Sequence, residues 1–343
     1  MTKILVTGGT GFLGGALVRR LQNMPVSITV VGRNRSVGEV LTQQGVRFIQ
    51  ADLADRAAME RACRNQDIVF HCGALSAPWG RRADFYSANL IGTQNVIHGC
   101  FTHKIKRLIH VSTPAIYFNY QNRLNVAEYD RLPAKPVNAY AETKRLAEQA
   151  INRAYQHGLP VITLRPRAIF GPGDQAIFPR LIRAIKSGRL RIIGGGQAQT
   201  DLTYIENVVS ALLLAQTSPP ETLGRAYNIT NGQPVSMWHM ITQICQRLGY
   251  PPPRRHVPFR VAYYGAGLLE TAHHIFMPHR EPMVTRYGVG LLGRTITLDI
   301  RAAQRDLGYQ PRVSMADGLE HFLTWWVKNQ NLLQESQTQP VET

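Results

Sequence analysis

The stretch Thr7-Gly8-Gly9-Thr10-Gly11-Phe12-Leu13-Gly14 decides the fold of this chain. It lies between a short apolar run, Lys3–Thr7, and a segment with helical spacing, Phe12–Gln22. Glycines between a strand and a helix allow a tight turn, a close approach of the backbone to a pyrophosphate and close packing of the helix on the strand. The helix N-terminus offers N–H groups and the positive end of its dipole to an anion. The stretch therefore predicts a dinucleotide-binding βαβ unit, and a glycine-rich turn without a ligand is the competing interpretation.

Strand-like and helix-like segments alternate along the first 170 residues. Apolar or β-branched runs follow at 27–31, 46–49, 67–71, 107–112 and 161–165, and helical patterns occur at 84–102 and 139–157. Such alternation is typical of βαβ units with right-handed crossovers and a parallel sheet. We therefore predict an α/β fold with a Rossmann-type, doubly wound parallel sheet.

The rhythm changes after Gly171-Pro172-Gly173. We predict a dinucleotide-binding domain over 1–172, completed by a strand and a helix within about 201–230. Residues 173–200 and 231–328 are predicted to form a smaller, mostly helical C-terminal substrate domain, whose last helix covers 315–328. The polar residues 329–343 are expected to form a flexible tail.

The composition is that of a globular protein, with 44% hydrophobic and 18% charged residues. The chain has no long uninterrupted apolar run, and its first residues lack the pattern of a secretory signal, so we expect a cytoplasmic protein. The cysteines, Cys63, Cys72, Cys100 and Cys245, have no zinc-type spacing. We therefore expect reduced thiols and no metal site.

Basic residues outnumber acidic residues by 39 to 22, which gives a formal net charge of +17. Such an excess favours nucleic acids, anionic membranes or phosphate-bearing ligands as partners. The basic residues are spread from Lys3 to Lys328 rather than clustered. A generally basic surface is thus the preferred interpretation, and we expect no nucleic-acid partner.

A second motif, Tyr140-Ala141-Glu142-Thr143-Lys144, lies at the start of the helical pattern 139–157. A spacing of four places Tyr140 and Lys144 on one helical face, one turn apart. An ammonium group near a phenol lowers the pKa of the phenol, so that the tyrosine can act as a general acid or base. The spacing is common by itself, but here it follows a dinucleotide turn and a strand that ends in Ser112-Thr113.

The combination of T-G-x-x-G-x-x-G, Ser112-Thr113 and Y-x-x-x-K resembles the extended short-chain dehydrogenase/reductase superfamily. Three later stretches, 164–174, 201–208 and 227–234, resemble the 3β-hydroxysteroid dehydrogenase family within it. That family includes sterol-4α-carboxylate 3-dehydrogenases and bacterial 2-alkyl-3-oxoalkanoate reductases. The resemblance extends over nearly the whole chain, from Lys3 to Trp326.

This resemblance implies roles for the matching positions. Tyr140 would exchange a proton with the substrate, and Lys144 would bind the nicotinamide ribose. Thr113, or its neighbour Ser112, would bind the substrate oxygen, and Asn89 would brace the active site. The cofactor would contact a larger set of residues: Gly8, Thr10, Gly11, Phe12, Leu13, Gly14, Asp52, Leu53, Gly73, Ala74, Tyr140, Lys144 and Pro166.

The end of the second strand predicts NADP as the preferred cofactor, with NAD as the alternative. An acidic residue that holds the ribose 2′-hydroxyl is expected about 20 residues after the glycine turn, and Gly32 takes that place. Arg33 and Arg35 follow and can pair with a 2′-phosphate. Sterol-type relatives often use NAD, and solvated arginines are the competing interpretation.

A hydrophobic secondary alcohol or ketone is the preferred substrate, of the 3β-hydroxysteroid, sterol carboxylate or β-keto acid type. Nucleotide-sugar epimerases and dehydratases resemble the same N-terminal half and are the first alternative. They carry an asparagine at the place of Ala168 and a diphosphate-binding arginine at the place of Thr200, and both are missing here. A non-catalytic NAD(P)-binding regulatory protein is the second alternative, and the intact Tyr140–Lys144 pair argues against it.

The segment 256–277 combines helical spacing with wide apolar surfaces. One stripe consists of Val261, Tyr264, Leu268, Ala272 and Ile275. So much apolar surface predicts either burial against the second domain or peripheral contact with an anionic membrane beside a site for a hydrophobic substrate. A homodimer is a further candidate assembly.

Overall fold

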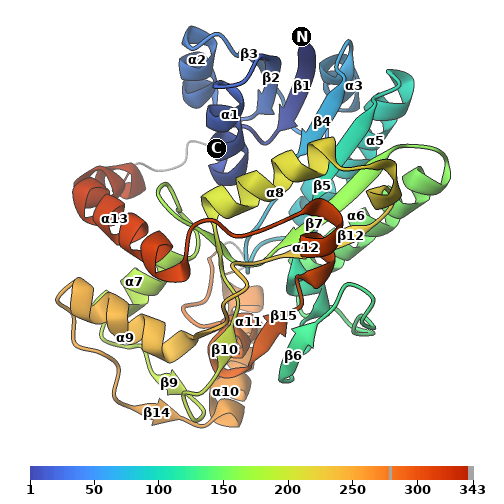
Figure 1. The fold of residues 1–343 in the computed structure, drawn as a ribbon. Helices are drawn as coiled ribbons and strands as arrows, with labels where there is room; N and C mark the ends of the chain where they lie inside the picture. The colour runs from blue at the N-terminus through green and yellow to red at the C-terminus, as the bar shows by residue number, and fades with distance from the viewer. Residues whose placement is uncertain (278–279, 339–343) are drawn as a thin grey trace.

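The computed structural model describes residues 1–277 and 280–338 of the 343-residue chain. Its centre is a seven-stranded parallel sheet with the strand order β12-β7-β5-β4-β1-β2-β3 (Figure 1). The strands are β1 (Thr2–Thr7), β2 (Val26–Gly32), β3 (Arg47–Gln50), β4 (Ile68–His71), β5 (Arg107–Val111), β7 (Val161–Pro166) and β12 (Ala226–Ile229). This order is that of doubly wound dinucleotide-binding sheets, so the predicted fold class is confirmed.

Helices cover both faces of the sheet because its strands are apolar on both sides. In β1, Ile4 and Val6 join a core cluster with Leu17 and Leu212, whereas Leu5 joins a second cluster on the opposite face. The first cluster includes α1 (Phe12–Leu21) and α8 (Ile205–Thr217). The second includes α3 (Arg56–Cys63), α5 (Gly92–Thr102) and α6 (Ala139–Gln156). The remaining N-terminal helix, α2 (Arg35–Gln43), packs against β3.

The long helix predicted over 84–102 contains an irregular turn. It consists of α4 (Arg82–Phe85), a π-helical turn over Tyr86–Ile91, and α5. The buried Asn89 lies in the π turn, where its Nδ2 donates to the Leu75 carbonyl at 3.1 Å and to Thr143 Oγ1 at 3.0 Å. Its Oδ1 accepts from the Leu75 N–H at 2.7 Å. Asn89 thus ties the loop after β4 to α6, one residue before Lys144.

The rest of the chain forms smaller elements at the end of the sheet where β1 finishes (Figure 1). Four helices dominate this part: α7 (Phe178–Lys186), α9 (Met237–Arg247), α10 (Phe259–Phe276) and α11 (Arg286–Gly293). Short strands form one four-stranded sheet, β13 (Val235–Ser236), β10 (Gln199–Thr200), β15 (Ile296–Leu298) and β6 (Arg123–Val126). Two strand pairs, β8 (Ile169–Phe170) with β11 (Thr203–Tyr204) and β9 (Ile192–Ile193) with β14 (His256–Val257), complete it.

The C-terminal helices differ from the prediction. After α12 (Arg301–Leu307), helix α13 begins at Met315 and continues to Thr338 rather than ending near residue 328. Residues 329–338 of the predicted flexible tail are therefore helical, because this polar stretch contains no proline or glycine that would stop a helix. The last part of that tail, 339–343, lies outside the described residues.

The four cysteines are free thiols, as predicted. Within residues 1–277 and 280–338, we find no helix that combines the length and the apolar character needed to cross a membrane.

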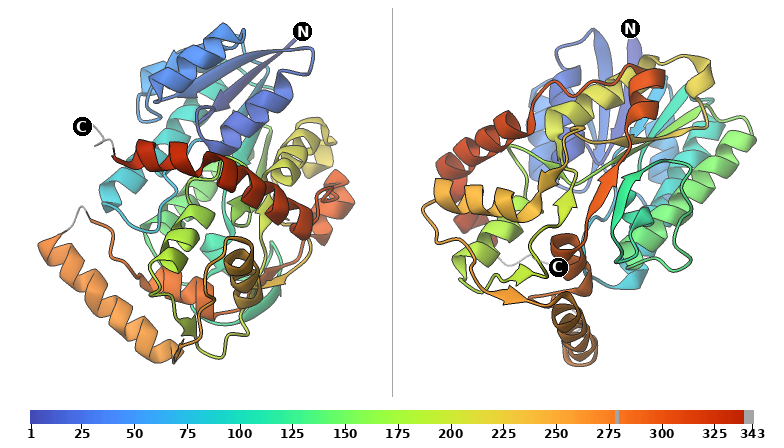
Figure 2. Two further views of the ribbon diagram at one scale, coloured as in Figure 1. Left: turned by 90° about the vertical axis from the view of Figure 1, so that its left-hand side faces the viewer. Right: turned by 60° about the horizontal axis from the view of Figure 1, so that its bottom comes forward.

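Helix α10 turns its apolar stripe toward solvent. Val261, Tyr264, Leu268 and Ile275 are between 62% and 75% exposed. The predicted burial of this stripe against the second domain is therefore wrong. The face of α10 that packs inward carries the small Ala266 and the buried Glu270, whose Oε2 accepts from Arg286 Nε of α11 at 2.6 Å. Both views in Figure 2 show α10 at the edge of the molecule.

Candidate active site

A cavity of about 1180 Å³ extends from the glycine turn to α10. It lies at the carboxyl ends of the central strands, which is where ligands bind in doubly wound sheets. The residues that follow β1, β4 and β5, namely Gly8, Gly73 and Thr113, line it together with Pro166 at the end of β7. The topology of the sheet thus brings four distant sequence segments to one site.

The glycine turn forms a backbone cradle at one end of the cavity. Gly8 has φ +68°, and a Cβ there would lie 2.5 Å from the Gly73 Cα. A Cβ on Gly14 would lie 2.3 Å from the Gly8 carbonyl oxygen. Helix α1 begins after Gly11 without a side-chain cap, so its first N–H groups remain available to a ligand. These features fit a dinucleotide pyrophosphate.

The end of β2 explains why residue 32 is a glycine. A Cβ at Gly32 would lie 2.3 Å from Oγ1 and 2.7 Å from Cγ2 of Thr10. Because both branches of the threonine lie close, one rotation of its side chain does not clear the space. Arg33 lines the cavity and lies 3.7 Å from Asp52 (Nη1 to Oδ2), whereas Arg35 pairs with Glu39 at 2.8 Å and does not line the cavity.

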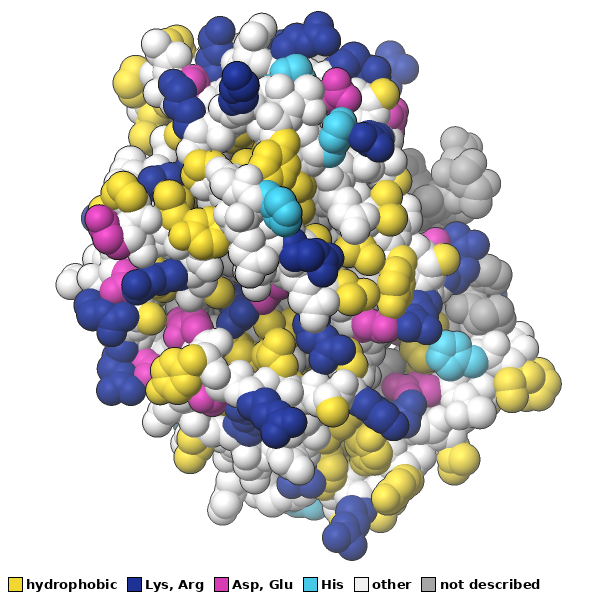
Figure 3. Space-filling view, turned by 90° about the vertical axis from the view of Figure 1, so that its right-hand side faces the viewer, with side chains coloured by type: hydrophobic (Ala, Val, Ile, Leu, Met, Phe, Trp, Pro, Cys, Tyr) yellow, Lys and Arg dark blue, Asp and Glu magenta, His cyan; other side chains and the backbone are white. Residues whose placement is uncertain are grey.

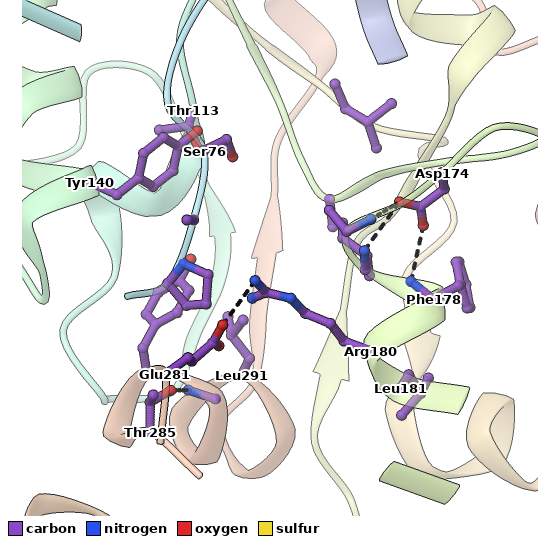
Figure 4. A pocket seen from close by; sticks show the side chains of 18 of the residues that line it. Ser76, Thr113, Tyr140, Asp174, Phe178, Arg180, Leu181, Glu281, Thr285 and Leu291 are labelled. Carbon is purple, nitrogen blue, oxygen red and sulfur yellow. Dashed lines mark hydrogen bonds and ion pairs between the residues drawn. The ribbon is translucent and has the colours of Figure 1, made fainter. Parts of the chain in front are cut away.

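Tyr140 and Thr113 meet at the middle of the cavity. The Asn138 Oδ1 caps α6 by accepting from the Ala141 N–H at 2.8 Å, which fixes Tyr140 in the first turn. The Tyr140 hydroxyl lies beside the side chains of Thr113 and Ser76, which line the same cavity. Figure 4 shows the ring pointing toward these two side chains. Three hydroxyl groups from separate segments therefore converge on one point.

Lys144 is fully buried behind this group. Its Nζ donates to the Val111 carbonyl at the end of β5, at 2.7 Å, and burial lowers the pKa of Lys144 to about 8. Burial raises the pKa of Tyr140, and the neighbouring hydroxyls of Ser76 and Thr113 oppose that shift. The prediction that Lys144 lowers the pKa of Tyr140 is wrong for this arrangement, because the ammonium group is directed to the backbone of β5. Tyr140 therefore keeps its proton at neutral pH.

The structure brings most of the predicted site residues together. The cavity wall contains Gly8, Thr10, Gly11, Phe12, Leu13, Gly14, Arg33, Asp52, Leu53, Gly73, Ala74, Ser112, Thr113, Tyr140, Lys144 and Pro166. Of the predicted contacts, Arg35 is the one that lies elsewhere. The sequence analysis assigned no role to Ser76, Arg167 or Tyr287, which also line the cavity. These three come from different segments, and no local motif links them to Tyr140.

The far end of the cavity has an apolar wall. It is formed by α9, β14, α10 and the segment around α11, and its side chains include Met237, Met240, Val257, Val261, Leu269, Val289 and Leu292. Arg180 of α7 reaches across to Glu281, with 3.0 Å between Nη2 and Oε2 (Figure 4). Such a wall with few polar groups is typical of a site for a bulky hydrophobic ligand.

Comparisons with known proteins agree with this geometry. The family described as NAD dependent epimerase/dehydratase matches residues 4–230. The chain is 38% identical, over 322 residues, to the 2-alkyl-3-oxoalkanoate reductase of Stenotrophomonas maltophilia (strain K279a), covering 92% of this chain and 97% of that protein. It is 35% identical, over 328 residues, to the decarboxylating sterol-4-alpha-carboxylate 3-dehydrogenase of Homo sapiens, covering 92% and 86%.

Solved structures share the fold. A UDP-glucuronic acid 4-epimerase from Bacillus cereus in complex with NAD matches with a TM-score of 0.74 and 23% identity, over 95% of this chain and 99% of that chain. At this level of identity the likeness establishes the architecture alone.

Proposed function

The chain belongs to the NAD dependent epimerase/dehydratase family, as an NAD(P)-dependent oxidoreductase of the extended short-chain type, and on this basis we propose that it reduces a ketone, or oxidises the matching secondary alcohol, on a bulky hydrophobic substrate. One observation carries the proposal. The Tyr140 side chain is directed toward Thr113 and Ser76 (Figure 4), in a cavity whose wall includes both the glycine cradle and apolar side chains.

The residues of the chain divide the work of such a reaction. The nicotinamide cofactor, when bound, exchanges a hydride with the substrate carbon. The hydroxyls of Tyr140 and Thr113 hold the substrate oxygen and stabilise the negative charge that develops on it. Tyr140 donates its proton to that oxygen during reduction and takes it back during oxidation. Lys144 would bind the ribose hydroxyls.

Two features favour this function over the alternatives. Ala168 and Thr200 line the cavity at the places where the resemblance puts the asparagine and the arginine of nucleotide-sugar enzymes. The curated relatives at 32–38% identity, which cover more than nine tenths of this chain, include reductases and sterol dehydrogenases. The Tyr140–Thr113–Ser76 group also disfavours a purely regulatory protein, which would not need a proton donor.

The test is turnover of NADPH by the purified protein with a panel of ketones. We expect oxidation of NADPH with long-chain 3-oxo compounds or with a 3-oxosteroid. We expect no conversion of UDP-glucose in the presence of NAD. Turnover of the sugar nucleotide alone, or of no ketone in the panel, would overturn the proposal.

We propose that NADP is the preferred cofactor and that Arg33 holds its 2′-phosphate. Replacing Arg33 with alanine should raise the KM for NADPH about tenfold or more, because a charge-assisted contact is lost, and should leave the KM for NADH unchanged. Initial rates with each cofactor measure the effect.

Arg35→Ala is the matched control, because Arg35 pairs with Glu39 away from the cavity. Equal effects of the two substitutions would remove Arg33 from cofactor selection. A change toward NAD by Gly32→Asp needs Thr10→Gly as well, since the aspartate would otherwise collide with Thr10.

We also propose that α10 rests on an anionic membrane surface, from which a hydrophobic substrate enters the cavity. Leu268 and Tyr264 are exposed, and Val261 and Leu269 of the same helix line the cavity. Exposed arginines, among them Arg254, Arg255 and Arg260, precede or begin the helix. Figure 3 shows hydrophobic side chains mixed with Lys and Arg at the lower end of the molecule, where Figure 1 places α10. Apolar contact combined with basic charge is the pattern of interfacial helices.

Leu268→Glu should weaken binding to phosphatidylglycerol-containing vesicles about tenfold or more, because a leucine side chain gains about 1.5–3 kcal/mol on burial. Vesicle sedimentation gives the partition, and NADPH binding should stay unchanged. Val40→Glu is the control, since it adds the same charge at an exposed hydrophobic residue of α2, away from the stripe.

Equal losses from Leu268→Glu and Val40→Glu would indicate charge alone and would argue against insertion of the stripe. A different result would assign this face to a second copy of the chain. In that case the wild type would form a homodimer and would not bind vesicles, and Leu268→Glu would dissociate the homodimer.

A further inference from the structure

Arg167 presents a buried guanidinium group to the cavity without a carboxylate partner. It follows β7, is 5% exposed and lines the cavity. Its Nη2 donates to Thr200 Oγ1 at 3.4 Å, and its buried Nε has no hydrogen-bond partner. Within the part of the chain that the structure describes, Arg167 forms no ion pair. A buried charge is costly unless it is paired, so this site favours an anionic ligand.

The neighbouring Arg165 shows how the chain satisfies a buried arginine internally. Its Nε and Nη2 donate to the two carboxylate oxygens of Glu148 at 2.9 Å and 2.6 Å. The negative charge of Asp201 influences the pKa of Arg167, but the Asp201 carboxylate is directed to the backbone. Its Oδ2 accepts from the Leu298 N–H at 2.7 Å. The side chain of Arg167 therefore keeps bonding capacity that no carboxylate of the described residues uses.

Arg167 is also held firmly in place. Its backbone N–H donates to the Ile229 carbonyl at 3.0 Å, and its own carbonyl accepts from Thr203 Oγ1 at 2.6 Å. The guanidinium thus projects from a fixed main chain, which is what selective recognition of a ligand requires.

The position of Arg167 places an anion close to the reacting oxygen. Strands β5 and β7 are neighbours, and the Ser112 N–H donates to the Leu164 carbonyl at 2.7 Å. Thr113 therefore lies about one strand spacing, roughly 4.8 Å, from the end of β7, which directly precedes Arg167. Arg167, Tyr140 and Tyr287 of α11 all line this cavity.

We propose that Arg167 binds a carboxylate of the substrate and so selects 3-oxo or 3-hydroxy acids over neutral ketones and alcohols of the same size. In such acids the carboxylate is separated from the reacting carbon by a single carbon, which suits an arginine beside the Tyr140–Thr113 pair. A planar guanidinium matches a carboxylate with two parallel hydrogen bonds. The inference rests on the proposed function and deepens it.

A carboxylate fits better than the diphosphate of a sugar nucleotide. A diphosphate carries at least two negative charges and is usually held by several cations, whereas Arg180, across the cavity, is paired with Glu281. The wall beyond Arg167 includes Arg189 and Arg191 and a set of apolar side chains from α9, α10 and α11. The apolar part suits the alkyl or ring portion of a hydrophobic acid.

The first experiment compares a 3-hydroxydecanoate bearing a 2-alkyl chain with its methyl ester, each oxidised with NADP. We expect the wild-type protein to prefer the acid, and Arg167→Gln to raise the KM for the acid about tenfold or more with the ester unchanged, as expected for loss of hydrogen bonds to a charged group. Arg167→Lys should restore part of the preference. Equal losses for acid and ester would assign Arg167 a structural role and overturn the inference.

A second measurement uses thermal unfolding and does not depend on turnover. Arg167→Gln should unfold at the same temperature as the wild type or higher, because it removes a buried unpaired charge. The acid should raise the Tm of the wild type but not that of Arg167→Gln, and the ester should affect both alike. A large drop in the Tm of Arg167→Gln, with no stabilisation of the wild type by the acid, would contradict the inference.

The outcomes separate the inference from the proposed function. Wild-type turnover of the ester or of neutral ketones without preference for the acid would refute the role of Arg167 and leave the oxidoreductase proposal intact. Turnover of none of these compounds would refute both. Binding of UDP-glucose that Arg167→Gln abolishes would assign the arginine to a diphosphate and overturn the carboxylate.

Discussion

Replacing Tyr140 with phenylalanine is expected to lower kcat by at least about 100-fold, which is the low end for removal of a general acid or base. The ring still fills its place in the first turn of α6, so the cavity keeps its shape. What is lost is the hydroxyl that lies beside Thr113 and Ser76 and that supplies the proton. The Kd for NADPH should change little, and steady-state rates together with fluorescence titration separate the two effects.

Tyr86→Phe is the control for this experiment. Its hydroxyl donates to Glu142 Oε1 at 2.8 Å on the outer side of α6, and Tyr86 does not line the cavity. It should therefore retain wild-type turnover. If Tyr140→Phe turns over at a near-wild-type rate, Tyr140 is not the proton donor. Tyr287 then becomes the candidate, because it is a second tyrosine that lines the cavity.

The central sheet could be predicted because its strands are buried on both faces. Segments such as 161–165 are short continuous apolar runs, and each appears in the structure within a residue or two of its predicted bounds. The helices α2 and α3 had no such signal, because only two or four of their residues are buried. The π turn around Asn89 was also invisible, since its cause is the tertiary hydrogen bonds of one side chain.

The small four-stranded sheet could not be predicted from periodicity. Its strands have two to four residues, which is too short for an alternating pattern, and they come from four distant parts of the chain. Helix α10 misled the sequence analysis for another reason. Its inward face carries Glu270, which becomes acceptable there only through its ion pair with Arg286, and so its apolar stripe remains outside.

The candidate site also combines features that the sequence predicts with features that it does not predict. The glycine turn and the Tyr140–Lys144 pair were predictable because their geometry is set by neighbours within four or five residues. The direction of the Tyr140 pKa was not, because it depends on burial and on where the Lys144 ammonium group points. Ser76 and Arg167 enter the site only because β4, β5 and β7 lie side by side in the sheet.

Gly14 and Gly15 offer a sharp test of the glycine cradle, because they are adjacent in α1 but have different surroundings. A Cβ on Gly14 would lie 2.3 Å from the oxygen and 2.8 Å from the carbon of the Gly8 carbonyl, so backbone would have to move. A Cβ on Gly15 would lie 3.5 Å from the Gly9 oxygen, which is ordinary contact.

Gly14→Ala is therefore expected to push α1 away from the turn and to raise the Kd for NADPH about 10- to 100-fold, because a lost hydrogen bond to a charged group costs about 1.5–3 kcal/mol. Its free energy of unfolding should fall by about 1–3 kcal/mol, as for an overpacked core.

Gly15→Ala should bind NADPH like the wild type and should be more stable by up to about 1 kcal/mol, because alanine favours a helix interior. Fluorescence titration with NADPH and thermal unfolding of both variants provide the measurements. Equal binding by the two variants would mean that contact between α1 and the turn does not shape the cofactor site. Binding would then have to depend on the remaining walls of the cavity, at Gly73 and Leu53, rather than on the turn that follows β1.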